Sequence, residues 1–150
     1  MEYILLTSML AFFSCATPPP SYPYFRTGEV ICVKNDARLV TLSSIYHAGN
    51  AVEAQKYAER NVIENLLFKG IAGCYDVPLI PDEQKSIQEH KAFYDWLVTQ
   101  REYERFVTDR TMSSTSAGKN GVSVTETITI DVPALRKEME KQGVVKKFGF

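Results

Sequence analysis

Two histidines, three cysteines and a few polar clusters are the residues of this chain that could take part in catalysis or bind a metal. His47 and His90 have no His or Cys partner at the spacing of metal ligands, which argues against a metal site and against a histidine base. No GxSxG or HExxH sequence occurs. We therefore expect no catalytic residue, no metal and no cofactor, in a protein that is not an enzyme.

Two fragments match the outline of catalytic motifs but lack their context. Ser116 and Lys119 fit S-x-x-K, the nucleophile motif of penicillin-recognising enzymes, whose serine stands at the start of a helix. Here the fragment falls in a Ser- and Gly-rich turn, and the S-D-N and K-T-G partners are missing. The acidic pair Glu102 and Glu104 would need a defined separation across a cleft to act on glycosides, and sequence alone does not show one.

The first fourteen residues form an apolar segment typical of an export signal. Residues 4–13 are broken only by Thr7 and Ser8, and their length fits a signal-peptide h-region but not a bilayer core of about 30 Å. The following stretch contains three consecutive prolines, which favour an extended tether. We expect residues 1–14 to be a signal peptide, 15–28 a Pro-rich tether and 29–150 a single domain.

Cys15 follows the small residue Ser14 and resembles the lipidated cysteine of bacterial lipoproteins. Lipidation would anchor the chain to a membrane of the cell envelope, on its periplasmic face or at the outer membrane. Cleavage after Ala16, which would release a soluble protein beginning at Thr17, is an alternative. A third possibility is that residues 4–13 remain as an uncleaved anchor or as part of the core.

The other two cysteines, Cys32 and Cys74, form an even pair if Cys15 carries lipid. An oxidising periplasm would permit a disulfide between them. Two separate buried thiols that behave as small apolar groups are the alternative, and the sequence favours this second interpretation.

Composition indicates an ordinary globular domain of 150 residues, with 45% hydrophobic and 23% charged residues. The formal net charge of −1 lacks the basic excess of a nucleic-acid-binding protein. Hydrophobic periodicity and turn signals predict an α+β fold. We expect a mainly antiparallel sheet of about four strands in β-β-α-α-β-β-α order, with the helices packed on one face.

The expected strands cover residues 29–34, 37–46, 105–116 and 122–130, and the expected helices follow Asn50, Asp82 and Asp131 as N-caps. In the first helix, apolar residues recur every four positions, whereas Glu53, Lys56, Glu59 and Arg60 are assigned to the outer face. Glu126 interrupts the apolar face of the last strand. We expect it either at the sheet edge or paired with a cation.

Three segments carry a resemblance: Thr41–Asn50, Glu53–Gly73 and Leu135–Phe150. Together they resemble a family of small exported proteins of the Bacteroidota, mostly uncharacterised lipoproteins. The chain is more distantly similar to envelope lipoprotein domains of the LPP-20 and curli-secretion type. The resemblance implies a sheet-and-helix domain that works by contact with other envelope components, and it implies no catalytic residue.

We therefore expect a non-enzymatic envelope lipoprotein that serves as a structural or adaptor subunit, in a secretion or surface-assembly machine. A protein partner would bind by strand addition at a sheet edge or through exposed aromatic side chains, of which Phe148 and Phe150 are candidates. The alternative is a periplasmic ligand-binding module that uses an aromatic cluster, although core packing is the commoner role of such clusters. The cluster comprises Phe93, Tyr94, Trp96 and Tyr103.

Overall fold

The computed structural model describes residues 24–27, 29–118 and 121–147. The expected signal peptide, the lipidation candidate Cys15 and most of the Pro-rich tether therefore lie outside the described residues, as do Lys119, Phe148 and Phe150. No helix among the described residues has the length and apolar composition needed to cross a membrane.

Four antiparallel strands form one sheet in the order β1-β2-β4-β3, which confirms the α+β prediction. The two central strands, β2 and β4, lie far apart in the sequence. β1 and β3 are the two edges of the sheet, and β3 is twice as long as β1. The bounds are Val30–Asn35 for β1, Leu39–Ala48 for β2, Val107–Gly118 for β3 and Gly121–Asp131 for β4.

The two faces of the sheet follow the alternation of residues along β2 and β4. Apolar side chains such as Val40 and Ile128 are buried on the inner face. The outer face carries hydroxyl groups that hydrogen-bond across the strands, for example between the Oγ1 atoms of Thr41 and Thr129 at 2.9 Å. The sheet therefore has one dry face and one polar face.

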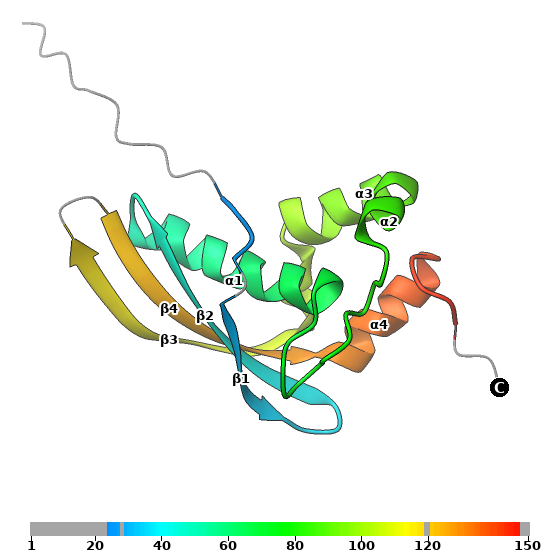
Figure 1. The fold of residues 1–150 in the computed structure, drawn as a ribbon, viewed down its shortest axis with the longest axis horizontal. Helices are drawn as coiled ribbons and strands as arrows, with labels where there is room; N and C mark the ends of the chain where they lie inside the picture. The colour runs from blue at the N-terminus through cyan, green and yellow to red at the C-terminus, as the bar shows by residue number, and fades with distance from the viewer. Residues whose placement is uncertain (1–23, 28, 119–120, 148–150) are drawn as a thin grey trace, which may run out of the picture.

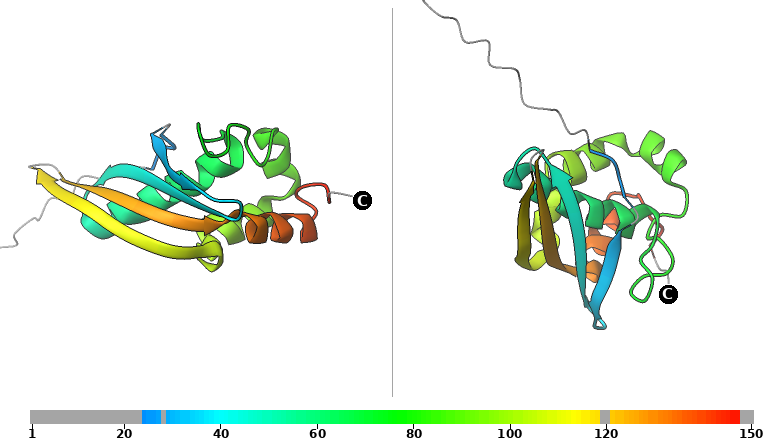
Figure 2. Two further views of the ribbon diagram at one scale, coloured as in Figure 1. Left: turned by 90° about the horizontal axis from the view of Figure 1, so that it is seen from below. Right: turned by 60° about the vertical axis from the view of Figure 1, so that its left-hand side comes forward.

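The helices cover the dry face. α1 lies along the concave side of the curved sheet, and α2, α3 and α4 gather at the end opposite the β3–β4 hairpin tip (Figures 1 and 2). A π-helical turn and a 3-10 helix continue the chain after α3. The bounds are Ala51–Phe68 for α1, Glu83–Glu89 for α2, Lys91–Tyr94 for α3, Asp95–Thr99 for the π turn, Glu102–Phe106 for the 3-10 helix and Val132–Lys141 for α4.

The three predicted N-caps are confirmed. The side chain of Asn50 accepts a hydrogen bond from the Glu53 amide at 2.9 Å, and Asp82 and Asp131 cap α2 and α4 in the same way. Gly70, with φ +83°, follows α1, and an added Cβ there would meet the Asp76 carbonyl oxygen at 2.8 Å. Glycine is therefore required at this turn.

Two expectations about acidic residues are wrong. Glu126 is 1% exposed on the central strand β4, so it does not lie at the sheet edge, and its hydrogen-bond partner is the neutral amide of Gln55 at 3.3 Å rather than a cation. Glu59 is fully buried rather than on the outer face of α1. Periodicity missed this because Arg101 and Tyr103, which contact Glu59, come from segments far from α1 in the sequence.

Candidate functional site

The structure does not bring the two histidines together. His47 lies on the outer face of β2, where its Nδ1 is 3.1 Å from the Ser123 hydroxyl, and His90 lies between α2 and α3. Within the described ranges, no three His, Cys, Asp or Glu side chains gather closely enough to hold a metal ion.

The two motif-like fragments have other places in the fold. Ser116 lies in β3 and not at the helix start that the serine nucleophile of this motif requires, and Lys119 lies outside the described residues. Glu104 pairs with Arg101 at 2.8 Å, and Glu102 faces Arg105 at 3.8 Å, both within one short helical segment. Each carboxylate of this pair thus faces a nearby cation, and Glu104 shares Arg101 with Glu59.

The aromatic cluster belongs mainly to the hydrophobic core. Phe93, Tyr94 and Tyr103 are buried, and Trp96 is half-buried against the same core, with its ring centroid 5.6 Å from that of Phe93. The Arg105 guanidinium lies 5.9 Å from the Trp96 ring centroid. Three of the four rings are therefore largely covered by the core, although Tyr94 also forms part of the wall of a cavity of about 370 Å³ beside Phe68 and Glu83.

Cys32 and Cys74 are joined in a disulfide, with their Cα atoms 5.6 Å apart, rather than forming the two separate thiols that the sequence favours. The bond ties β1 to the turn that follows α1. Asn35 strengthens the same contact, because its Nδ2 donates to the Cys74 carbonyl at 3.0 Å. Sequence spacing alone does not place these two segments side by side.

The segment just before the sheet, residues 24–27, lies against α1 and β2. The Tyr24 ring packs on the rings of Tyr46 and Tyr57 at centroid distances of 5.6 and 5.4 Å, and its hydroxyl donates to Glu64 at 2.8 Å. The Thr27 amide donates to the Asn61 side chain at 2.8 Å. Residues 24–27 are therefore held to the body of the domain.

A buried charge cluster, which the sequence did not indicate, lies between α1 and the β3–β4 pair. One oxygen of the Glu59 carboxylate accepts hydrogen bonds from Arg101 at 2.7 Å and from the Tyr103 hydroxyl at 3.0 Å. Its other oxygen is 3.1 Å from Nη1 of Arg110. Arg101 reaches Glu59 from a left-handed backbone conformation, φ 62°, which is uncommon for a residue other than glycine.

Burial dominates the electrostatics of this cluster. It raises the pKa of Tyr103 well above its usual range, with a further increase from the Glu59 carboxylate. Burial also raises the pKa of Glu126, whose Oε2 has no hydrogen-bond partner among the described residues. The two carboxylates line none of the four cavities described for the molecule, so the cluster has the character of a structural network in the core.

The edge of β3 is the first surface suited to binding. All of its pairing is with β4, and no described strand lies on its other side. At the opposite edge, by contrast, β1 is short and its end is occupied by the turn that carries Cys74, whose Sγ lies 3.7 Å from the Lys34 carbonyl oxygen. Met112 of β3 is 52% exposed, unusually so for a large apolar side chain. The β3 edge is thus the more open of the two.

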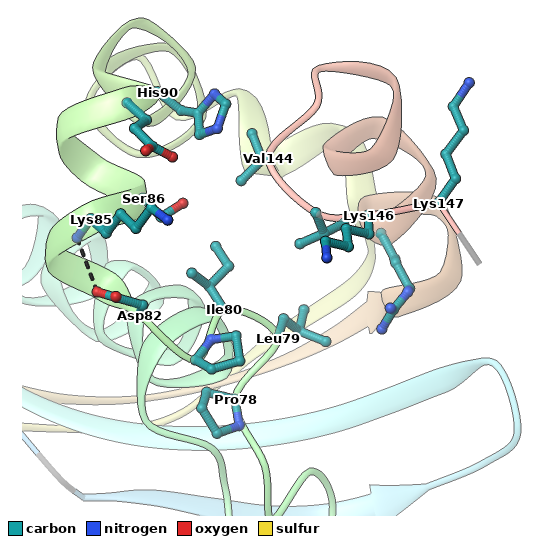
Figure 3. Close-up of a pocket in the computed structure, with 14 residues that line it drawn as sticks. Pro78, Leu79, Ile80, Asp82, Lys85, Ser86, His90, Val144, Lys146 and Lys147 are labelled. Carbon is teal, nitrogen blue, oxygen red and sulfur yellow. Dashed lines mark hydrogen bonds between the residues drawn. The ribbon is translucent and has the colours of Figure 1, made fainter. Parts of the chain in front are cut away.

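A groove between α2 and the segment that follows α4 is the second such surface (Figure 3). We refer to this cavity of about 720 Å³ as the α2–α4 groove. Loop residues 78–81 form one wall, and Figure 3 shows Val144 and Lys146 coming from the other. His90 and Ser86 line it from the α2 side. Sequence reasoning missed the groove because its parts come from three separate segments.

These surfaces are defined by geometry alone. No protein-family model, curated protein or solved structure matches this chain.

Proposed function

We propose that this chain is a non-enzymatic envelope lipoprotein, anchored through Cys15, that acts as an adaptor by adding an extended segment of a partner protein to strand β3. The observation that carries the binding part of the proposal is the outer edge of β3, which is twelve residues long and has no strand beyond it in the part of the chain that the structure describes. An edge strand presents a row of backbone N–H and C=O groups, and another chain can complete them by strand addition.

The disulfide supports the proposal that this domain is exported from the cytosol. Bonds of this kind persist in oxidising surroundings such as the periplasm and are rare in the cytosol. The Cys32–Cys74 bond is therefore consistent with an exported domain, as are the apolar leader and the resemblance to small Bacteroidota lipoproteins. A place in a secretion or surface-assembly machine would give the β3 edge its partner.

Site-specific photo-crosslinking in cells tests the edge. A photoreactive phenylalanine analogue is placed at Thr111 or Met112 of β3, and separately at Val52, which is 77% exposed at the start of α1 and serves as the control. We expect discrete adducts of higher mass from the β3 positions and none from Val52. Adducts from Val52 alone, or from no position, would contradict strand addition. An adduct with the mass of two copies of this chain would show that the β3 edge forms a homodimer interface rather than a site for a partner protein.

Intact mass of the protein extracted from membranes tests the anchor. We expect a chain that begins at Cys15 and carries acyl mass, because Cys15 is the proposed lipidation site. Recovery of the chain in the soluble fraction, beginning at Thr17 without added mass, would show a released protein. A chain that retains Met1 would overturn export by cleavage.

The aromatic cluster gives little support to the alternative of a ligand-binding module. That hypothesis needed Phe93, Tyr94, Trp96 and Tyr103 to line a pocket, and three of them are buried in the core. Trp96 is half-buried, and Tyr94 reaches the wall of a cavity that none of the other three rings lines. If this protein binds a small molecule, other residues must form the site.

A further inference from the structure

The α2–α4 groove has an apolar lining that needs explaining. Pro78, Leu79, Ile80 and Pro81 line it from the loop before α2, and Val144 and Val145 line it from the segment after α4. The volume of about 720 Å³ lies in the range of roughly 300–1,000 Å³ typical of small-molecule sites. The groove is therefore large enough for one ligand with a long apolar part.

The backbone of this lining offers few hydrogen-bond donors. Pro78 and Pro81 have no N–H group. The amides of Leu79 and Ile80 donate to the carbonyls of Leu66 and Leu67 at 3.3 and 2.8 Å, and the Val144 amide donates to Met139 at 2.9 Å. An extended peptide would find almost no N–H partner along these residues, whereas a hydrocarbon chain needs none.

The charged residues around the groove favour an anion. Lys85, Lys146 and Lys147 line it together with two carboxylates, those of Asp82 and Glu89, although the whole chain carries a formal charge of −1. Arg136 also lines it, but its guanidinium pairs with Glu140 at 3.4 Å. Asp82 is already engaged as the cap of α2. The three lysines form no ion pair with another described residue, so their charges face solvent or a ligand.

From this combination we propose that the α2–α4 groove binds a single-chain anionic lipid, of which a long-chain fatty acid is the simplest. The acyl chain lies on the apolar loop and on Val144 and Val145. The carboxylate lies among the lysines at the rim, with Lys85 on one side and Lys146 on the other. A single chain fits the volume better than two would. The inference is independent of the β3 edge.

Displacement of a fluorescent fatty acid, cis-parinaric acid, tests this proposal on the full chain after bound lipid has been removed. We expect hexadecanoate to displace the probe and hexadecanol, which has the same chain without the charge, to do so at least about tenfold less well. Inorganic phosphate should not displace it, because the apolar contact supplies most of the binding.

Charge reversal distinguishes lipid binding in the groove from lipid binding to other apolar segments of the chain, including the leader. The double substitution Lys85→Glu and Lys146→Glu should weaken hexadecanoate binding about tenfold or more and leave hexadecanol binding nearly unchanged. Lys137→Glu, on α4 but outside the groove, is the matched control and should change neither. Thermal unfolding of each variant verifies that these exposed substitutions leave the fold intact.

Three results would overturn the proposal. One is the absence of displaceable binding by hexadecanoate. Another is equal binding of hexadecanoate and hexadecanol together with no effect of the double charge reversal. The third is displacement of the probe by an acidic peptide but not by hexadecanoate, which would make the groove a peptide site. Because the β3 edge is untouched in every variant, none of these results bears on the adaptor function.

Discussion

Glu59 and Glu126 lie in the same buried layer between α1 and the β3–β4 pair, yet different groups balance their charges. Glu59 is held by Arg101, Arg110 and the hydroxyl of Tyr103. Glu126 has only the amide of Gln55, at 3.3 Å. The first carboxylate is therefore compensated as an ion, and the second is better tolerated without its charge.

Removal of the Glu59 side chain should lower the free energy of unfolding. Glu59→Ala leaves two guanidinium groups facing a cavity, and removing one member of a buried ion network typically destabilises a protein by about 3 kcal/mol. Urea unfolding measures the change. The double variant Glu59→Met with Arg101→Met should lose less than Glu59→Ala alone, because it removes both charges of a pair. A larger loss in the double variant would show that Arg101 acts elsewhere.

Removal of the Glu126 charge should stabilise the folded protein. Burial raises the pKa of this carboxyl, and the Glu59 carboxylate adds to the effect. Its folded-state pKa therefore exceeds its unfolded-state pKa, so its stabilising contribution is full at acid pH and is lost as pH rises through the folded-state value. We expect Glu126→Gln to raise the free energy of unfolding at pH 7 by on the order of 1 kcal/mol.

The pH profile checks the cause of that gain. The advantage of Glu126→Gln over the parent chain should shrink toward zero near pH 3, where the carboxyl is protonated in both states. Glu89→Gln, on the exposed face of α2, should change stability by less than about 0.5 kcal/mol at either pH. A gain that persists unchanged in acid would assign the effect to packing.

At the scale of elements, local signals in the sequence predicted those features for which a rule links a residue type to a backbone conformation. The caps at Asn50, Asp82 and Asp131 and the alternation along β2 and β4 were predicted for this reason. The burial of Glu59 was not, because it depends on Arg101 and Arg110, which approach from distant segments. The same holds for the α2–α4 groove.

The disulfide is the strongest link between two elements. It closes a sequence separation of 42 residues between β1 and the turn after α1, which should contribute roughly 2 to 4 kcal/mol. Reduction of the parent chain, or the double variant Cys32→Ala with Cys74→Ala, should lower the melting temperature. The double variant should be insensitive to reductant. A parent chain that also ignores reductant, with two titratable thiols, would show that the bond does not form.

At the scale of the whole molecule, the strand order could not be read from the sequence. The pattern predicted two hairpins, and β1–β2 and β3–β4 are hairpins, but nothing local specifies that β2 pairs with β4 at the centre. That pairing depends on which faces the helices cover. It also joins the first and last parts of the domain, so the sheet cannot close until most of the chain is present.

A truncated chain tests this dependence. A chain that ends at Gly118 retains β1 to β3 and α1 to α3 but lacks the central strand β4. We expect it to show no cooperative unfolding transition, because β2 and β3 then have no common neighbour. A chain that ends at Lys147 keeps every described element and should unfold cooperatively. Cooperative unfolding of the shorter chain would mean that α1 and β1–β2 form a domain alone.

The docking of Tyr24 on α1 and β2 has a consequence for where this protein can operate. If Cys15 is the anchored residue, the nine residues from Cys15 to Pro23 connect the membrane to Tyr24. A fully extended segment of nine residues spans about 30 Å. Tyr24 would therefore lie within about 30 Å of the lipid surface, so the side of the body that carries Tyr24 would stay close to the membrane, whatever partner the other sides meet.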